Sequence, residues 1–400
     1  MVEPGERRFL IVAGEASGDA HAAGLVRALR ALSPCRVAGV TGPALEAAGA
    51  ERIAPMDDLA VIGFSAILPR LPRIWRAYRR MLAAADAVRP HACILIDSPG
   101  FNFRLGPALA RRGVKVFYYI APQVWAWHAE RAARMAKWVD RLAVVFRFEQ
   151  KIFRDAGVDA RFVGHPLLDG LAPEVSEADL RRELGVAPHP RLIGLLPGSR
   201  AQEIRQHLGP LIQASRRLSA TRENLVFVVA LSGAAARETG STPETAVRDL
   251  CARAGLAPPG APGTPPGWVL RVTHGRTRAV QAFATCCAVA SGTATLETAL
   301  FQTPLAIVYR VGALNYAIAK RVIRLSRIGL PNIVAGADVA PELIQGDFTA
   351  ERVAATLAPW IDDPSERERA RTRLAAVRAQ LGEPGASARA AALALDLAGG

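Results

Sequence analysis

The 400-residue sequence has few cysteines, almost no lysine and no long hydrophobic run, and each shortage narrows the class of protein. The five cysteines are never spaced as Cys-x-x-Cys, which indicates buried thiols rather than a zinc site or a disulfide framework. No apolar stretch approaches the roughly 20 residues that a membrane-spanning helix requires. The opening residues do not resemble a secretory signal, because their short apolar part leads directly into glycine and acidic residues. We therefore expect a cytoplasmic protein.

The net charge is +14, and nearly all of the positive charge comes from arginine. Because guanidinium groups bind phosphate and carboxylate well, this surplus favours phosphorylated ligands, an anionic membrane surface or nucleic acid. A genome rich in guanine and cytosine would give the same composition without a functional cause. A nucleic-acid binder also needs a basic stripe with exposed stacking aromatics. No motif in this chain indicates one, so we expect no nucleic-acid partner.

Short apolar runs alternate with helical stretches, as is typical of parallel sheets covered on both faces. The alternation stops at a polar, proline-bearing segment, 169–190, and then begins again. We therefore predict an α/β protein of two doubly wound, Rossmann-like domains. Strands are expected at 8–14, 92–97, 115–121, 141–146 and 160–164, and then within 191–200, 224–231, 287–300 and 304–310.

The turn after the first predicted strand reads Gly-Glu-Ala-Ser-Gly-Asp at 14–19. Ligands bind at the carboxyl ends of the strands in open α/β sheets, so residues that follow strands are the candidates for a site. Glycines around a serine allow a tight turn whose backbone N–H groups face a ligand. Glu15, Ser17 and Asp19 are therefore candidates, although a plain turn in which Asp19 caps a helix is an alternative.

A second strand, 92–97, ends in Asp97. A carboxylate at the carboxyl end of a strand is a candidate general base, and a turn cap is the competing interpretation. The sequence contains no Asp-x-Asp pair, which metal-dependent sugar-nucleotide enzymes often use to hold a divalent cation. We therefore expect no metal and no cofactor, with arginine and helix dipoles stabilising any departing diphosphate.

Two turns in the second half of the chain suit a diphosphate. Gly198, Ser199 and Arg200 begin a helix, where N–H groups and a guanidinium favour phosphate. A later strand ends in a small-residue turn that also begins a helix, and a carboxylate one turn further along could accept two ribose hydroxyls. A capping box explains part of this second pattern. The residues of the second pattern are Ser291, Gly292, Thr293 and Glu297.

Two segments contain tryptophan in positions that favour contact with lipid or ligand. Trp125 and Trp127 follow a predicted strand, and we expect one ring to flank the ligand site, with core packing as the alternative. The segment 64–80 mixes apolar, aromatic and arginine residues, which suits an anionic lipid surface. An ordinary amphipathic helix explains that segment equally well.

Eight motifs occur in an order that resembles the lipid-A-disaccharide synthase family of inverting glycosyltransferases. They span most of the chain, and their order makes the resemblance more specific than any one motif. The motifs are Gly-Glu-Ala-Ser-Gly-Asp at 14–19, Trp-Ala-Trp at 125–127, Phe-Glu at 148–149, Val-Gly-His-Pro at 163–166, Leu-Pro-Gly-Ser-Arg with Glu-Ile at 196–204, Ser-Gly-Thr-Ala-Thr-Leu-Glu at 291–297, Leu-Pro-Asn at 330–332 and Pro-Glu-Leu-Ile-Gln at 341–345.

The resemblance implies a GT-B fold, in which two Rossmann-like domains face a cleft and the C-terminal helices cross back. The acceptor domain would be 1–170, the UDP-sugar domain 171–361, and helices within 362–398 would pack on the acceptor domain. The implied partners are a UDP-sugar donor, an acylated sugar-phosphate acceptor and the inner face of the inner membrane. A homo-oligomer is left open. The implied reaction joins UDP-2,3-diacylglucosamine to 2,3-diacylglucosamine 1-phosphate in lipid A biosynthesis.

The resemblance also implies roles for single residues and reveals one departure. Glu15 and Ser17 would lie near the reacting sugars. The family usually reads Asp-x-Pro-Asp-Phe-Asn, with the second acid as the favoured base, whereas Gly100 stands there in this chain. Asp97, Glu15 or Asp19 would then serve as the base, or activity is lost. The implied UDP-binding residues are Arg200, Ser291, Gly292, Thr293, Glu297, Asn332 and Gln345.

Two further interpretations remain beside this one. The first is another GT-B enzyme that acts on UDP-N-acetylglucosamine, either an epimerase or a transferase. The second is a catalytically degenerate paralogue that binds UDP-sugar or membrane without turnover. An apolar acceptor groove near Trp125 would distinguish the lipid enzyme from an enzyme that acts on UDP-N-acetylglucosamine. Gly100, which replaces the favoured base, leaves the degenerate paralogue open.

Overall fold

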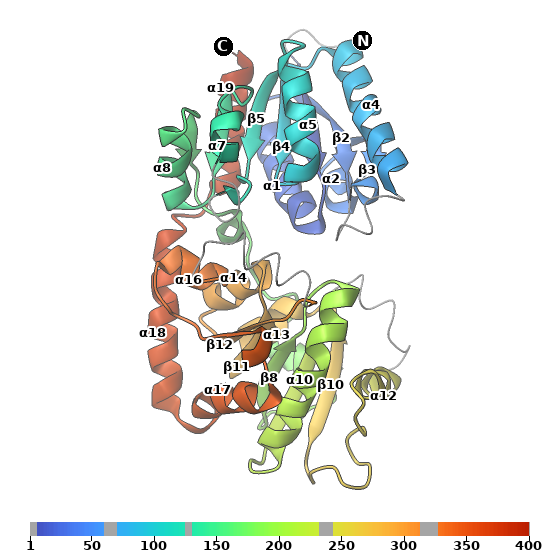
Figure 1. Ribbon diagram of the computed structural model, residues 1–400, viewed down its shortest axis with the longest axis vertical. Coiled ribbons are helices and arrows are strands. Elements are labelled where there is room, and N and C mark those ends of the chain that lie inside the picture. Colours follow the sequence, from blue (N-terminus) through green and yellow to red (C-terminus); the bar gives the residue numbers. More distant parts are fainter. Residues whose placement is uncertain (1–5, 60–69, 125–129, 232–242, 313–326, 400) are drawn as a thin grey trace. The chain divides into compact units, whose positions relative to one another are not determined.

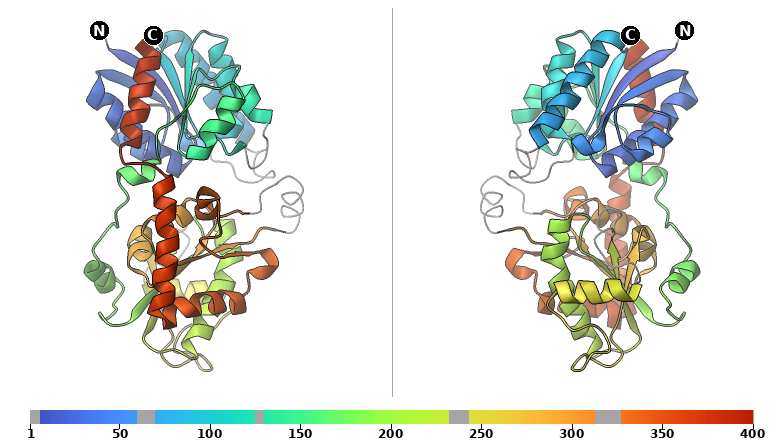
Figure 2. Two further views of the ribbon diagram at one scale, coloured as in Figure 1. Left: turned by 90° about the vertical axis from the view of Figure 1, so that its left-hand side faces the viewer. Right: turned by 90° about the vertical axis from the view of Figure 1, so that its right-hand side faces the viewer.

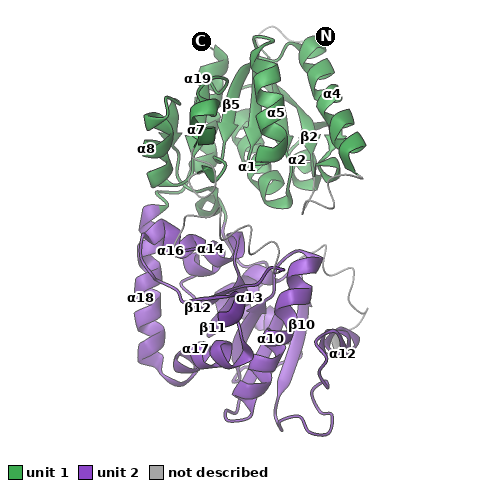
Figure 3. Ribbon diagram, in the orientation of Figure 1, with its two compact units in different colours: residues 1–170, 381–400 green, residues 171–380 purple. Residues whose placement is uncertain are grey.

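The computed structural model describes residues 6–59, 70–124, 130–231, 243–312 and 327–399 (Figure 1). The chain forms two compact units (Figure 3). Unit 1 comprises Met1–Gly170 and Leu381–Gly400, and unit 2 comprises Leu171–Gln380. Among the described residues, no helix combines the length and the apolar character needed to cross a membrane.

Unit 1 contains a seven-stranded parallel sheet in the order β3-β2-β1-β4-β5-β6-β7. Helices cover both of its faces, and Figure 2 shows α19 beside the sheet. The strands are β1 (Arg7–Ala13), β2 (Cys35–Thr41), β3 (Glu51–Pro55), β4 (Ala92–Ile96), β5 (Lys115–Tyr119), β6 (Arg141–Val144) and β7 (Ala160–Phe162). The helices are α1 (Ala16–Leu32), α2 (Pro43–Ala47), η1 (Met56–Asp58), α4 (Leu71–Val88), α5 (Pro99–Ala110), α7 (Glu130–Met135), α8 (Arg147–Asp155), η3 (Pro166–Asp169) and α19 (Ala386–Gly399).

Unit 2 contains a six-stranded parallel sheet in the order β10-β9-β8-β11-β12-β13. The strands are β8 (Arg191–Leu196), β9 (Leu225–Leu231), β10 (Val269–His274), β11 (Cys286–Ala290), β12 (Leu305–Tyr309) and β13 (Glu342–Ile344). The helices are α9 (Glu177–Glu183), α10 (Ala201–Ser219), α12 (Pro243–Arg253), α13 (Thr277–Phe283), α14 (Thr293–Leu300), α16 (Leu330–Ala335), η4 (Gln345–Asp347), α17 (Ala350–Asp362) and α18 (Pro364–Gln380).

The central strands are apolar throughout because both faces of each sheet are covered. Every residue of β4, β9 and β11 is buried. A strand buried on both faces cannot alternate polar and apolar residues, so its sequence is a continuous apolar run. This pattern confirms the prediction of two doubly wound parallel sheets.

Each sheet has one point where the direction of strand addition reverses. In unit 1 this point lies between β1 and β4, and in unit 2 it lies between β8 and β11. Parallel strands end at the same edge, so the turns that follow the two strands of each pair are neighbours. Such switch points are where open α/β sheets bind ligands. The β1–α1 and β4–α5 turns form one candidate region, and the β8–α10 and β11–α14 turns form another.

The last helices depart from the expectation that 362–398 packs on the first unit. Helix α18 packs instead on α14, α16 and α17 of unit 2, while α19 packs on α1 of unit 1. The buried residues of α18 are Ala370, Leu374 and Val377, which lie on one face at helical spacing. This narrow apolar stripe packs on unit 2. The expected packing on unit 1 is therefore wrong for α18 and holds for α19.

Candidate functional site

The β4–α5 turn holds Asp97 at the carboxyl edge of the first sheet. Asp97 and Ser98 both adopt left-handed φ angles, 43° and 39°, which residues other than glycine rarely take. The β1–α1 turn lies directly beside them, because a Cβ placed on Gly14 would stand 2.0 Å from Ser98 Oγ. Glycine at 14 therefore lets the two turns of this switch point approach each other closely.

Asp97 is partly buried, and its surroundings make it a stronger base than an ordinary carboxylate. Burial first and the charge of Glu15 second raise the pKa of Asp97 to about 6, against the opposing effect of the hydrogen bond from the Ser98 N–H. A base with a pKa just below neutral is mostly ionised at pH 7 and still accepts a proton readily. The position of Asp97 at the edge of the sheet and its raised pKa both support the prediction that it can act as a base.

Glu15 and Ser17 lie at the same edge as Asp97. Glu15 occupies the position that precedes α1, Ser17 belongs to the first turn of that helix, and both are exposed. Since the charge of Glu15 affects the pKa of Asp97, these two carboxyl groups act on each other. The structure thus brings together Glu15 and Asp97, two of the three predicted acids.

Asp19 has a structural role, which corrects its place among the candidate bases. Its buried carboxylate accepts hydrogen bonds from the backbone N–H groups of Gly42 (2.9 Å), Ala44 (2.8 Å) and Leu45 (3.2 Å). These are N–H groups at the start of α2, which has no intrahelical partners for them. Asp19, which lies within α1, therefore caps α2, whereas the sequence had suggested a cap for the helix that its own turn opens.

Gly100 lies in the first turn of α5, at the position of the missing family acid. It is exposed, and no atom stands within 4 Å of the place where its Cβ would be. The backbone would therefore accept an aspartate there without a clash. Trp125 and Trp127, the predicted flank of the ligand site, lie outside the described residues, as does the part of the proposed membrane segment that precedes α4.

The β8–α10 turn is organised by Glu203, which the sequence analysis had not assigned a role. Its Oε2 accepts from the backbone N–H groups of Ser199 (3.2 Å) and Arg200 (3.3 Å), and its Oε1 pairs with Arg200 Nη1 (3.0 Å). Gly198 has a φ of 118°, and a Cβ there would stand 2.5 Å from Glu203 Oε2. Glu203 bonds back to the N-cap N–H as the glutamate of a capping box does, but Arg200 replaces the Ser or Thr of that motif, so the sequence contained no such signal.

The β11–α14 turn is the neighbour of the β8–α10 turn, because Val289 of β11 pairs with Leu196 of β8. Gly292 and Thr293 are exposed at the start of α14, and Gly292 takes a φ of 150°. Ser291 Oγ donates to the carbonyl of Ile328 (3.1 Å). The predicted phosphate residues of the two turns therefore share one edge of the sheet.

Glu297 lies one turn further along α14 and pairs with Arg278 of α13. The distance from Arg278 Nε to Glu297 Oε1 is 3.1 Å. Burial raises the pKa of Glu297, and the charge and hydrogen bond of Arg278 oppose that rise. Glu174 accepts from the backbone N–H groups of Arg278 (3.1 Å) and Ala279 (2.8 Å), which fixes the start of α13.

Asn332 shapes a loop, which corrects its place among the UDP-binding residues. Its Nδ2 donates to the carbonyl of Ala340 (2.7 Å) and to Glu342 Oε1 (2.8 Å). Its Oδ1 accepts from the N–H groups of Val339 and Ala340, both at 2.9 Å. The side chain is buried and its amide is fully used within unit 2, so Asn332 holds this loop in place.

Gln345 follows β13 at the same edge as the two turns. It has a φ of 54°, and with its side-chain oxygen and nitrogen exchanged its amide donates to the Val311 carbonyl (3.2 Å) and accepts from the Val311 N–H (3.0 Å). Arg310, which follows β12, donates to the carbonyls of Gln345 (3.2 Å) and Phe348. Gln345 therefore holds together the chain segments that follow the last two strands.

His207 joins two strand ends of unit 2, and no sequence motif had indicated it. The ring is fully buried, with Nδ1 2.7 Å from the Pro197 carbonyl, while Nε2 accepts from the Arg310 N–H at 2.9 Å. Burial lowers the pKa of His207, so the ring is neutral with its proton on Nδ1. One imidazole thus bridges the β8–α10 turn and the end of β12.

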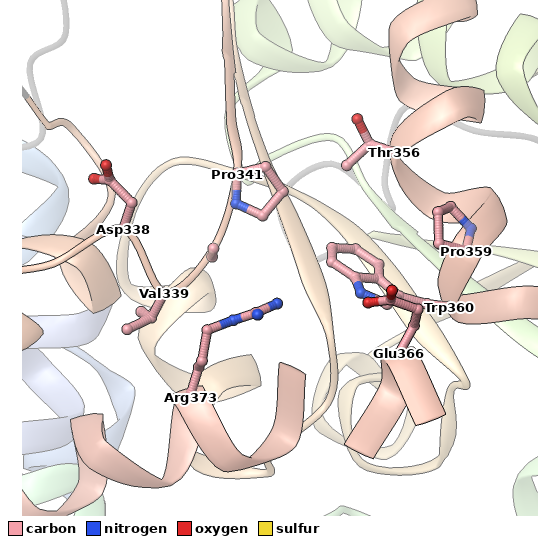
Figure 4. A pocket seen from close by; sticks show the side chains of 9 residues that line it. Asp338, Val339, Pro341, Thr356, Pro359, Trp360, Glu366 and Arg373 are labelled. Carbon is pink, nitrogen blue, oxygen red and sulfur yellow. The ribbon is translucent and has the colours of Figure 1, made fainter. Parts of the chain in front are cut away.

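A pocket of about 460 Å³ lies elsewhere in unit 2 (Figure 4). Trp360, Arg373 and Pro341 line it, and none of the predicted ligand residues does. Among the described residues, no group of three or more histidine, cysteine, aspartate or glutamate side chains could hold a metal. The five cysteines are buried free thiols.

The two switch points have complementary chemistry. The first offers a carboxyl base, Asp97, beside a second acid, Glu15. The second offers two helix starts, a guanidinium and hydroxyl groups, which suit a diphosphate. A base and a diphosphate site are what a sugar transfer from a nucleotide donor needs.

The chain is similar in sequence to lipid-A-disaccharide synthases, and its fold is shared by glycosyltransferases and by UDP-N-acetylglucosamine 2-epimerases. A solved calicheamicin glycosyltransferase, CalG4, matches with a TM-score of 0.57 at 17% identity, covering 100% of this chain and 99% of that one, which confirms the GT-B fold class. Lipid-A-disaccharide synthases of Syntrophus aciditrophicus and Anaeromyxobacter sp. (strain K) are 41% and 39% identical, covering 97% and 96% of both chains. The lipid-A-disaccharide synthetase family model matches residues 9–246 and 269–396, so the chain belongs to this family.

Proposed function

We propose that this chain joins UDP-2,3-diacylglucosamine to 2,3-diacylglucosamine 1-phosphate, giving the β-1,6-linked disaccharide 1-phosphate and UDP. The observation that carries the proposal is the family match over residues 9–246 and 269–396, which includes both switch points. The chemistry of the residues at these switch points agrees with it. Asp97 and Glu15 supply acids in unit 1, and the turns after β8 and β11 supply phosphate-binding groups in unit 2.

The donor diphosphate binds at the starts of α10 and α14. The backbone N–H groups of Gly198, Gly292 and Thr293 face the phosphates, and the Arg200 guanidinium, held by Glu203, adds positive charge. These groups stabilise the negative charge that grows on UDP as the glycosidic bond to the donor breaks. Glu297 accepts the ribose hydroxyls, and the charge and hydrogen bond of Arg278 oppose the rise in its pKa that burial causes. Glu203 and His207 hold the two turns in place and touch no ligand.

Asp97 acts as the general base. It takes the proton from the 6-hydroxyl of the acceptor while that oxygen attacks the anomeric carbon of the donor. The bond from this carbon to the diphosphate breaks, and its electron pair leaves with UDP. Attack from the side opposite UDP inverts the anomeric centre, and the β linkage results. The nearby Glu15 charge strengthens Asp97 as a base.

Helix α4 provides peripheral contact with anionic lipid. Its exposed residues include Leu71 and Trp75, which are 43% and 59% exposed, and four arginines along the same helix. Trp75 stacks on Tyr78 with ring centroids 5.3 Å apart, which presents a broad aromatic surface. Apolar and cationic side chains together suit the interface of an anionic membrane, where acylated substrates are found.

A direct assay tests the reaction. Purified protein is mixed with donor and with radiolabelled acceptor, and the disaccharide and UDP are measured together. The proposal expects both products in equal amounts and only when both substrates are present. Conversion of UDP-N-acetylglucosamine without acceptor would favour an epimerase instead.

A degenerate UDP-sugar-binding paralogue is the second candidate, because Gly100 replaces the family's favoured base. Gly100→Asp separates the two candidates, since the site has room for the side chain. If the parent chain is active and Asp97→Asn is not, Asp97 is the base. If the parent is inactive and Gly100→Asp turns over, the parent has lost its activity through this one residue.

A further inference from the structure

The Asp97 carbonyl is held by two buried side chains that the proposed mechanism does not use. Asn102 Nδ2 donates to this carbonyl at 2.8 Å and to the Ile96 carbonyl at 3.2 Å. The hydroxyl of Tyr118, on the neighbouring strand β5, donates to the same Asp97 oxygen. Asn102 and Tyr118 are both fully buried, so these hydrogen bonds are shielded from water.

The turn that they hold has an unfavourable backbone conformation. Asp97 and Ser98 are consecutive non-glycine residues with φ angles of 43° and 39°. Left-handed residues of this kind persist only where the surrounding structure imposes them, and they are concentrated at functional sites. The Ser98 carbonyl accepts from the N–H groups of Phe101 (3.1 Å) and Asn102 (3.0 Å), so α5 begins directly after the turn.

A fixed carbonyl also fixes the direction of the carboxyl group on the same residue. The Asp97 carbonyl and side chain are both attached to Cα, so hydrogen bonds that set φ and ψ decide where the side chain points. A strained turn between a strand and a helix is a known way to present a reactive side chain at the edge of a sheet. A displacement of about 1 Å can cost about 100-fold in rate.

We propose that Tyr118 and Asn102 are positioning residues that hold the Asp97–Ser98 turn in its left-handed form and thereby aim the Asp97 carboxyl at the acceptor hydroxyl. The inference rests on the proposed role of Asp97 as the base. It explains how Asp97 can serve in a chain that has glycine at 100. Neither residue touches substrate.

Tyr118→Phe tests the proposal, with Tyr119→Phe as the matched control. Both residues are fully buried in β5, but successive residues of a strand face opposite sides of the sheet. Tyr118 packs in the core beneath α4 and α5, whereas the groups that affect the pKa of Tyr119 are Ser387, Asp169 and Arg389, on the side of α19. Tyr118→Phe should lower kcat about 10- to 100-fold and leave the KM of both substrates within about twofold. Tyr119→Phe should keep the parent kcat.

The pH profile gives a readout that a purely structural role would not change. The acid limb of kcat/KM should lie near pH 6 in the parent, because burial and then the charge of Glu15 raise the pKa of Asp97 to about 6. Without the Tyr118 hydroxyl the turn relaxes and water reaches Asp97. The limb of Tyr118→Phe should therefore move to lower pH, and that of Tyr119→Phe should not.

Adding Ser98→Gly to Tyr118→Phe tests whether the lost kcat comes from the turn or from a general loss of stability. Glycine takes a left-handed φ without steric cost, so one of the two strained residues is relieved and the turn depends less on the Tyr118 hydroxyl. Adding Ser98→Gly to Tyr118→Phe should restore kcat at least about threefold. Loss of kcat without this rescue would assign Tyr118 to general stability and overturn the proposal.

The outcomes separate this inference from the function on which it rests. If Asp97→Asn keeps the parent kcat, Asp97 is not the base, and both proposals fall. If Asp97→Asn is inactive while Tyr118→Phe matches Tyr119→Phe in kcat and in its acid limb, the base stands and the positioning role is overturned.

Discussion

Asp97 is the proposed base in this chain, because Gly100 stands at the position of the second acid in the motif that the family usually has. Asp97 has a pKa raised to about 6 by burial and then by Glu15, which suits proton transfer near neutral pH. Asp97→Asn keeps the shape of the side chain and removes its basicity. We expect kcat to fall about 100-fold or more, while UDP binds as before by calorimetry. Full activity in this variant would transfer the role to Glu15.

His207 should affect UDP binding without touching UDP. His207→Leu fills similar space but leaves the Pro197 carbonyl and the Arg310 N–H without their partner, which costs more than the bond itself gains. We expect UDP to bind about tenfold more weakly by calorimetry. His207→Gln has both a donor and an acceptor and should bind UDP nearly as the parent does. Equal affinities for the Leu and Gln variants would contradict the bridging role.

Asp19 and Asn332 show where residue-level prediction from sequence stops. The sequence placed Asp19 after the first strand, and the family resemblance implied that Asn332 binds UDP. The sequence could not reveal that α2 places three backbone N–H groups around Asp19 or that the loop at 339–340 surrounds Asn332. Whether a polar side chain faces a ligand or its own backbone depends on elements distant in the sequence, and these have no local signal.

The start of helix α19 is capped by one residue, Asp169. Asp169 accepts from the backbone N–H groups of Gly385 (2.7 Å), Ala386 (2.9 Å) and Ser387 (2.8 Å). Asp169→Ala should destabilise the docking of α19 by about 1 kcal/mol, which would appear as faster amide hydrogen exchange in 386–399. Unchanged exchange there would show that packing on α1 holds the helix without the cap.

The same cap should weaken in acid. Burial acts to raise the pKa of Asp169, but hydrogen bonds from Ser387 and the backbone N–H groups outweigh it and lower the pKa below its usual value. A lowered folded-state pKa stabilises the protein above the unfolded pKa of about 3.9, and that stability is lost as the pH falls through the folded value. Exchange in α19 should therefore accelerate below about pH 4 in the parent and depend less on pH in Asp169→Ala.

Helix α4 should control attachment to anionic vesicles. Reversing Arg76, Arg79 and Arg80 to glutamate replaces attraction with repulsion, so sedimentation with anionic lipid should fall at least about tenfold. The matched control is the same reversal at three exposed arginines of α18. Equal loss in both variants would mean that total charge, and not α4, governs binding. The control residues are Arg371, Arg373 and Arg378.

At the scale of the whole molecule, the two sheets could be predicted from the sequence because the same pattern, an apolar run followed by a helical stretch, occurs many times. Each central strand is an apolar run buried on both faces, and each site residue follows such a run. The assignment of α18 was wrong because a helix with one narrow apolar stripe can pack on either unit. The left-handed turn at Asp97 was also outside the reach of sequence reasoning, since its cause lies in Asn102 and in Tyr118 of the next strand.

The central claim is that this chain transfers an acylated sugar from UDP to an acylated acceptor with a protein carboxylate as its base. The most direct measurement is the amount of UDP and of β-linked disaccharide formed by the purified protein from both acylated substrates, in parallel with Asp97→Asn. We expect equal amounts of the two products from the parent and about 1% or less of that rate from the variant. No disaccharide from the parent, or equal rates from both proteins, would contradict the claim.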